Sequence, residues 1–174
     1  MNGDDFLTSG ADNLNRFKGQ GVITMYRIMV VDDEDYILKA LNRVLATRPD
    51  WEVETYTDAA TALRRARTTV FDAVITDYRM PDMDGIEMLQ ELRTMQPDTI
   101  RILLTGVIDI DTLMSAINQA GAFRFVPKPW DDDQLLESVE EGLKFRDILV
   151  ENKILAQTVR DQREALRSMG YDGE

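Results

Sequence analysis

The stretch "ITDYRMPDMDG", residues Ile75 to Gly85, ends an apolar run on a carboxylate at Asp77. Aspartate is depleted in strands, and burying an ionised carboxylate is costly unless a partner or a metal compensates for the lost water. Asp77 therefore either marks an ordinary turn with Pro81, or meets a positive charge at the end of a strand. The rest of the sequence distinguishes these two interpretations.

On both sides of this stretch the sequence alternates between strand patterns and helix patterns. The predicted strands are residues 26–31, 51–56, 71–76, 100–105 and 122–126, and the predicted helices are residues 35–47, 59–68, 86–95, 110–120 and 131–169. Crossovers of this length suit parallel neighbours, and the first, third and fourth strands are nearly all apolar, as central strands are. We expect an α/β fold, a flavodoxin-like doubly wound sheet of five parallel strands with an extended C-terminal helix.

The composition narrows the class of protein. With 174 residues, 44% hydrophobic and 30% charged, the chain suits one domain with an appendage. No apolar run reaches the roughly 20 residues of a membrane helix, and the N-terminus lacks a secretion signal, so we expect a cytoplasmic protein without a membrane partner. A net charge of −12 argues against direct binding to nucleic acid.

The chain contains neither cysteine nor histidine. Disulfides, thiolate or imidazole metal ligands, histidine-based triads and a phosphohistidine on this chain are therefore excluded. Acid–base or nucleophilic chemistry would have to use carboxylates, Lys, Ser, Thr, Tyr or a metal.

Polar side chains follow four of the predicted strands. Asp32 and Asp33 follow the first strand, Asp77 follows the third, Thr105 ends the fourth and Lys128 follows the fifth. Each residue alone has an ordinary explanation as a helix cap, a turn or a loop residue. Ligands of doubly wound sheets bind beyond the carboxyl ends of the strands, and all five residues fall at that edge, which predicts a shared site.

The residue types at this edge favour phosphoryl transfer. Clustered carboxylates without His or Cys suit a hard divalent cation, Mg²⁺ or Mn²⁺. Such a cation would offset carboxylate repulsion and leave Asp77 able to act as a nucleophile, and carboxylate nucleophiles can form aspartyl phosphates. Lys128 would supply a second positive charge and Thr105 a hydrogen-bond donor for the transferred group.

Four sequence blocks, "VVDDE", "TDYRMPDMDG", "LLTG" and "FRFVPKPW", occur in order on these elements. With them, residues 26–143 resemble the receiver domain of bacterial two-component response regulators. The resemblance implies Mg²⁺-dependent transfer of a phosphoryl group to Asp77 from the phosphohistidine of a sensor histidine kinase, or from a small acyl phosphate. It implies these roles: Asp33, Asp77 and the backbone carbonyl of Arg79 as metal ligands, Asp32 acting through a metal-bound water, Thr105 and Lys128 binding the phosphoryl group, and Phe125 as the rotating switch aromatic.

The sequence indicates less specifically which effector the receiver would control. The segment from "LLTG" to "FRFVPKPWDDDQL" resembles receivers attached to HD-GYP-type cyclic-di-GMP phosphodiesterases, or to related signalling enzymes, more than receivers of DNA-binding regulators. A stand-alone receiver acting as a phosphorelay or docking module is an alternative. A haloacid-dehalogenase-like phosphatase is a weaker one, because that class needs a DxD motif after its first strand and Asp32-Asp33-Glu34 does not supply it. We expect self-phosphorylation and dephosphorylation rather than turnover of a substrate.

The last predicted helix continues beyond the receiver with a heptad pattern. We call its two apolar positions the seam; they are Phe145, Asn152, Val159 and Leu166 at one position, and Ile148, Leu155, Gln162 and Met169 at the other. A single Asn among apolar residues favours a parallel two-stranded coiled coil. We therefore predict a leader at residues 1–24, a receiver at 25–144, and a homodimeric helical extension at 145–174 leading to an effector domain or protein.

Overall fold

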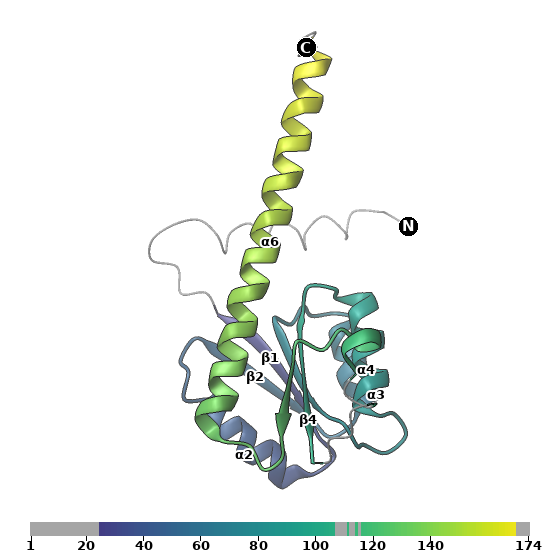
Figure 1. The fold of residues 1–174 in the computed structure, drawn as a ribbon, viewed down its shortest axis with the longest axis vertical. Coiled ribbons are helices and arrows are strands. Elements are labelled where there is room, and N and C mark those ends of the chain that lie inside the picture. The colour runs from purple at the N-terminus through teal and green to yellow at the C-terminus, as the bar shows by residue number, and fades with distance from the viewer. Residues whose placement is uncertain (1–24, 107–110, 112–113, 115, 170–174) are drawn as a thin grey trace.

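The computed structural model describes residues 25–106 and 116–169, together with residues 111 and 114. They form an α/β domain around an all-parallel sheet with strand order β2-β1-β3-β4-β5 (Figure 1). The flavodoxin-like fold is thus confirmed. The predicted leader, residues 1–24, lies outside the described residues, as do residues 110, 112, 113 and 115 of the helix predicted at 110–120.

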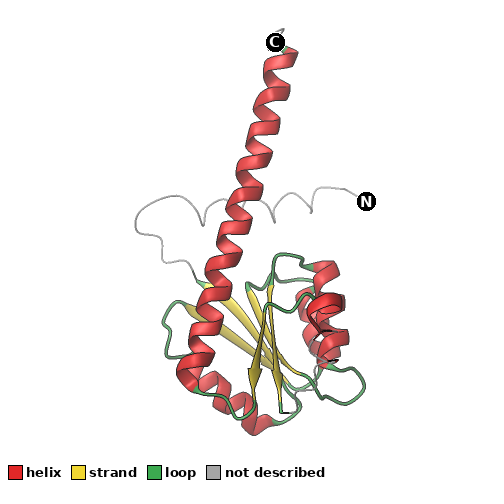
Figure 2. Cartoon of the chain, viewed as in Figure 1, coloured by secondary structure: helices red, strands yellow, loops and turns green. Residues whose placement is uncertain are grey.

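The elements alternate along the chain as predicted (Figure 2). The strands are β1 (Tyr26–Val31), β2 (Trp51–Tyr56), β3 (Ala73–Asp77), β4 (Ile100–Thr105) and β5 (Arg124–Pro127). The helices are α2 (Asp35–Leu45), α3 (Ala59–Ala66), α4 (Gly85–Met95), the π-helical turn η1 (Ala116–Ala120) and α6 (Asp132–Ser168).

Strand β3 starts later than predicted and extends to Asp77. The reason is local, because the backbone N–H of Phe71 donates to the side-chain carbonyl of Gln96 instead of to a neighbouring strand. The amide nitrogen of Gln96 in turn donates to the backbone oxygens of Ala66 and Thr69. A buried glutamine from the end of α4 therefore satisfies the polar groups of the loop before β3.

Two apolar clusters lie on opposite faces of the sheet. Helices α2 and α6 pack on one face, and α3 and α4 pack on the other (Figure 1). Strand β1 contributes side chains to both clusters. Ile28 and Val30 pack on the α2–α6 side, and Met29 and Val31 pack on the α3–α4 side. A strand buried on both faces reads as a continuous apolar run, which explains the sequence pattern.

Helix α6 has two halves with different environments. Its first half packs along the sheet and buries residues as far as Val150, while the second half projects away from the domain and is exposed (Figure 1). Gly142 permits the close approach, because a Cβ at this position would lie 2.6 Å from Cγ2 of Ile100.

The seam residues point to solvent in the single chain. Phe145, Ile148, Leu155, Val159, Leu166 and Met169 are all exposed large apolar side chains, and Asn152 and Gln162 are exposed as well. The ring of Phe145 also stacks on Phe123 of the same chain at a centroid distance of 5.6 Å. Among the described residues, no helix is both long and apolar enough to cross a membrane.

Candidate functional site

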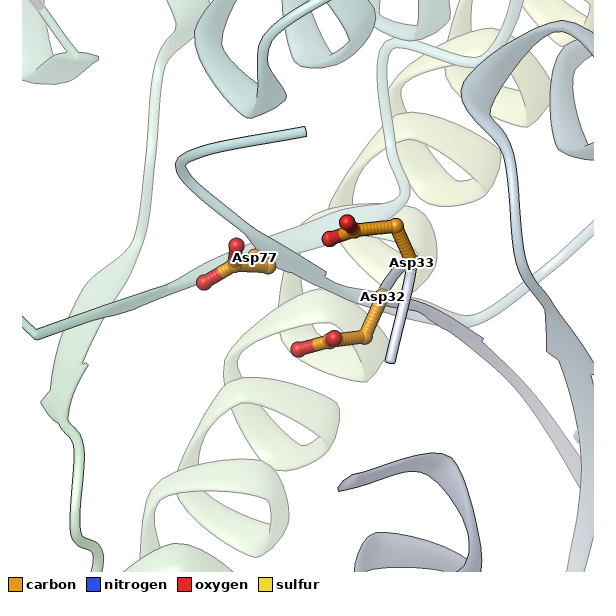
Figure 3. Close-up of side chains that lie close together, drawn as sticks. All are labelled: Asp32, Asp33 and Asp77. Atoms are coloured by element: carbon orange, nitrogen blue, oxygen red, sulfur yellow. The ribbon is translucent and has the colours of Figure 1, made fainter. Parts of the chain in front are cut away.

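Three carboxylates meet at the carboxyl edge of the sheet. Asp32 and Asp33 follow β1, and Asp77 ends β3. The two strands are hydrogen-bonded neighbours, with Val31 opposite Thr76, so their ends lie side by side. One oxygen from each of the three carboxylates lies within 4.8 Å of the others, and Figure 3 shows the three side chains gathered around the ends of these strands.

The three carboxylates differ in exposure. Asp32 is completely buried, Asp77 is 7% exposed, and Asp33 is exposed to solvent. One oxygen of Asp32 accepts a hydrogen bond from the backbone N–H of Glu34 at 2.9 Å, which fixes the loop into α2. The sheet thus holds two of the acidic groups rigidly, and Asp33 forms the open side of the cluster.

Lys128 supplies the positive charge that the buried carboxylate of Asp77 requires. Its Nζ lies 2.6 Å from Oδ2 of Asp32 and 2.9 Å from Oδ1 of Asp77. The backbone N–H of Lys128 donates to the carbonyl of Thr105 at 2.9 Å, which anchors the end of β5 to β4. Asp77 is therefore a buried carboxylate with a partly buried cationic partner, and the interpretation as a turn residue alone does not describe it.

Burial and ion pairing shift the pKa values of Asp32 and Lys128 in opposite directions. Burial raises the pKa of the Asp32 carboxyl, and the hydrogen bond from Lys128 counteracts part of that rise. Burial alone would lower the pKa of Lys128, but its hydrogen bonds to Asp32 and Asp77 prevail and raise the pKa above its usual value. Lys128 is consequently a fixed positive charge over the physiological pH range.

The loop after Asp77 is shaped by a close backbone contact. A Cβ on Gly85 would lie 2.1 Å from the carbonyl oxygen of Asp77, so no side chain fits there. The N–H of Gly85 donates to the carbonyl of Tyr78 at 2.9 Å. Asp84 begins α4 with a capping box, in which its side chain accepts from the N–H of Glu87. The "DG" pair signals a turn in the sequence, but only the structure reveals the contact with Asp77.

The remaining candidate residues surround this cluster. Thr105 is 3% exposed at the end of β4, one residue beyond the position that pairs with Asp77. Phe125 on β5 is partly buried and packs against the cluster on the α3–α4 side. Arg79 is exposed in the loop after β3. The five residues predicted at one edge therefore do occupy that edge.

These features define a receiver-type α/β domain, with an acidic cluster and a lysine at the carboxyl ends of parallel strands. The family model described as "Response regulator receiver domain" matches residues 28–140. The chain therefore belongs to the response regulator receiver domain family.

Relatives of known name include transcriptional regulators. The chain is 35% identical over 118 residues to the hydrogenase transcriptional regulatory protein HoxA of Bradyrhizobium diazoefficiens, a match that covers 68% of this chain and 24% of that protein. It is 35% identical over 133 residues to the regulatory protein AtoC of Escherichia coli, with 76% and 28% covered. The chain thus spans about a quarter of the length of these relatives.

Similar solved structures include a receiver domain and a protein described as an enzyme. The signal receiver domain of an HD domain-containing protein from Pseudomonas fluorescens aligns with a TM-score of 0.68 and 33% identity, covering 71% of this chain and 98% of that one. A structure described as adenylate cyclase from Rhodopirellula baltica aligns with a TM-score of 0.71 and 32% identity, covering 76% and 98%. Both alignments support the α/β fold, and the first structure is a named receiver domain.

Proposed function

We propose that this chain is a cytoplasmic receiver that takes a phosphoryl group from a sensor histidine kinase onto Asp77. The observation that carries the proposal is the position of Asp77, which ends a buried strand inside an acidic cluster and contacts Lys128 at 2.9 Å. A carboxylate held in this way is positioned as a nucleophile, and it has a neighbouring cation to balance the incoming negative charge.

The donor set fits a hard divalent cation, Mg²⁺ or Mn²⁺. The cluster of Asp32, Asp33 and Asp77 offers carboxylate oxygens within 4.8 Å of one another and includes no sulfur or imidazole ligand. Asp33, Asp77 and the backbone carbonyl of Arg79 would hold the ion, and Asp32 would act through a bound water. When bound, the ion supplies positive charge to the oxygens of the transferred phosphoryl group.

The transfer step uses Asp77, its contact Lys128, and the nearby Thr105. A carboxylate oxygen of Asp77 attacks the phosphorus of the kinase phosphohistidine, and an O–P bond forms as the N–P bond breaks. The imidazole nitrogen leaves with the bonding electron pair and takes a proton from solvent. Lys128 stabilises the phosphoryl oxygens by charge, and the hydroxyl of Thr105 donates a hydrogen bond to one of them.

The proposed response passes from Thr105 to Phe125. A hydroxyl drawn toward the phosphoryl group leaves space behind it, and the partly buried Phe125 ring on the adjacent strand would turn inward to fill that space. This movement would bias one of two states of the surface formed by β5 and α6, because a ligand shifts an equilibrium only through its differential affinity.

The exposed second half of α6 is the proposed route to the output. Its seam would pair with the same seam of a second copy as a parallel coiled coil, since six large apolar side chains are exposed along it. The pair would lead to an effector domain or a separate partner. We propose a signalling enzyme as the effector, by analogy with the HD domain-containing protein whose receiver is similar. The transcriptional regulators HoxA and AtoC make a DNA-binding effector the second candidate, and a stand-alone docking receiver is the alternative.

The test is intact-mass measurement after incubation with Mg²⁺ and a small acyl phosphate. The parent chain should gain one phosphoryl group, and the gain should be lost with a chelator and in Asp77→Asn. Asp84→Asn is the matched control, because Asp84 lies in the same loop outside the acidic cluster. Absence of any Mg²⁺-dependent gain in the folded parent chain would favour an unphosphorylated docking module.

A further inference from the structure

Helix α6 is bound to the amino edge of the sheet by a group of polar contacts, at the opposite end from the acidic cluster. We call this group the amino-edge clamp; its members are Tyr26, Asp72, Asp98, Arg146, Asp147 and Lys153. Tyr26 begins β1, Asp72 immediately precedes β3, and Asp98 shortly precedes β4. Residues at or just before the starts of three strands thus each contact the same helix.

The central contact of the clamp is a buried ion pair. Nη2 of Arg146 lies 3.0 Å from Oδ1 of Asp72, and the two side chains are 4% and 0% exposed. The other oxygen of Asp72 accepts from the backbone N–H of Arg27 at 2.7 Å. The backbone of Asp72 also bonds to both neighbours, donating to the carbonyl of Arg27 and accepting from the N–H of Ile100. One residue therefore links β1, β3, β4 and α6.

A second contact lies beside the ion pair. The hydroxyl of Tyr26 donates to Oδ2 of Asp147 at 2.6 Å, and Oδ1 of Asp147 lies 3.5 Å from Nη1 of Arg146. Further along the helix, Lys153 pairs with Asp98 at the surface. The clamp extends over two turns of the helix, so it restricts rotation of α6 as well as its position.

The chemistry of the pair argues for orientation rather than stability. Replacing a buried ion pair by apolar residues is often neutral or stabilising, because burial removes both charges from water. Arg146 also keeps a buried Nε that has no hydrogen-bond partner within the part of the chain that the structure describes. An apolar side chain at this position would cover the sheet without desolvating a charge. It would not fix the rotation of the helix, however, whereas a guanidinium paired with a carboxylate has a defined geometry.

The position of Arg146 on the helix relates the clamp to the seam. Arg146 lies on the same face as the buried residues Val139 and Val150. With roughly 100° of rotation per residue, the seam residues Ile148 and Leu155 fall about 200° and 180° from Arg146. The buried pair and most of the seam therefore lie on opposite sides of the helix, whereas Phe145, about 100° from Arg146, still contacts Phe123 of the domain.

We propose that the buried Asp72–Arg146 pair is a positioning device, which fixes the rotation of α6 on the sheet and so directs the seam away from the domain. Strand β3 ends at Asp77 and is preceded by Asp72, so the same buried strand connects the acidic cluster with the clamp. The inference does not depend on phosphorylation, and it holds for the unmodified chain.

The test uses the absence of cysteine in the chain. Val150→Cys introduces a single thiol on the buried face of α6, at a position that is 8% exposed. Its reaction rate with a thiol reagent reports whether α6 stays seated beyond Leu143. Glu151→Cys, at an exposed position, measures the intrinsic reactivity of a thiol on the same helix.

The pair is then neutralised without creating a cavity, by Asp72→Asn with Arg146→Met. We expect the unfolding midpoint to stay close to that of the parent, while the Val150→Cys thiol reacts roughly tenfold faster or more, because local opening of α6 becomes easier. Glu52→Gln removes an exposed ion pair with Arg27 at the same edge and should leave the rate unchanged.

A conservative variant separates positioning from charge alone. Arg146→Lys keeps the positive charge but loses the planar fork, so its labelling rate should lie between those of the parent and the neutralised chain. If the thiol stays as protected in the neutralised chain and in Arg146→Lys as in the parent, apolar packing alone seats the helix and the proposal is wrong. If the neutralised chain does not fold, the comparison of Arg146→Lys with the parent decides in the same way.

Discussion

The ammonium of Lys128 lies 2.9 Å from the carboxylate of Asp77, although strand β4 separates the strands from which they come. Lys128 also lies 2.6 Å from Asp32, so it joins the ends of β1, β3 and β5. A chain that buries two carboxylates at one edge needs this charge to offset the lost solvation. The same arrangement leaves Asp33 exposed as the open side of the cluster.

The first prediction concerns metal binding. Because Asp33 contributes to the acidic cluster but is exposed, Asp33→Ala should remove Mg²⁺ affinity without unfolding the domain. A cation that binds only the folded state stabilises it by about 2.7 kcal/mol at a hundred times its Kd. Thermal unfolding with and without Mg²⁺ should therefore show an upward shift in the parent and little shift in Asp33→Ala.

The control for metal binding is Asp35→Ala, at an exposed carboxylate nearby that lies outside the cluster. It should retain the Mg²⁺ shift of the parent. An undiminished shift in Asp33→Ala would show that the cation binds elsewhere.

The second prediction concerns the backbone contact at Asp77. Gly85→Ala places a methyl group 2.1 Å from the Asp77 carbonyl, so the loop must move, at a cost of about 1–3 kcal/mol. Urea unfolding should show this loss, and phosphorylation should slow because Asp77 is displaced. Gly106→Ala is the matched control, since no described atom lies within 4 Å of its added Cβ. Equal unfolding midpoints for both variants would contradict the contact.

The sheet and the shared edge could be predicted from sequence for a physical reason. Central parallel strands are buried on both faces, so β1, β3 and β4 read as apolar runs and their ends are marked by the polar residues Asp32, Asp77 and Thr105. The carboxyl ends of parallel strands lie at one edge of a sheet, so these three residues are expected to lie close together. Strand β3 was displaced because the buried Gln96 takes the N–H of Phe71, and no local pattern encodes a contact with a distant glutamine.

The clamp was not predictable from the heptad pattern. No sequence pattern singled out Arg146 or Asp147, and the receiver was predicted to end at residue 144. In the structure Arg146 is buried and α6 contacts the domain as far as Lys153. Burial of an arginine depends on a partner, and the partner Asp72 lies far away in sequence. The contact of Gly85 with Asp77 was not predictable either, because it depends on the path of the loop between the two residues.

The third prediction concerns the pH dependence of stability. Burial, followed by the hydrogen bond to Asp147, raises the pKa of Tyr26 well above its usual value. The unfolded phenol ionises near pH 10, while the folded one stays protonated, so this contribution is present below pH 10 and declines as the pH rises further. Tyr26→Phe should cost about 1 kcal/mol at pH 8.

The measurement compares urea unfolding of the parent and Tyr26→Phe between pH 8 and pH 11. The difference in free energy of unfolding between the two proteins should shrink above pH 10, because only the parent loses the Tyr26 contribution. A difference that stays constant or grows over this range would show that the hydroxyl does not donate to Asp147.

The fourth prediction concerns the homodimer. The full chain should be dimeric by sedimentation, and a chain ending at Lys153 should be a folded monomer, because it lacks five seam positions but keeps the clamp. A chain ending at Lys144 also loses Arg146 and should be less stable. Asn152→Leu should strengthen association and loosen its register. A full chain that stays monomeric at high concentration, with and without beryllofluoride, would rule out the coiled coil and leave the receiver assignment intact.

The central claim is that Asp77 is the residue that carries the phosphoryl group. Borohydride reduces an aspartyl phosphate to homoserine, so treatment after incubation with Mg²⁺ and a small acyl phosphate marks the acceptor permanently. Peptide mass mapping should then find homoserine in place of Asp77, with Asp32, Asp33 and Asp84 unchanged. Homoserine at one of those other aspartates, with Asp77 intact, would contradict the account.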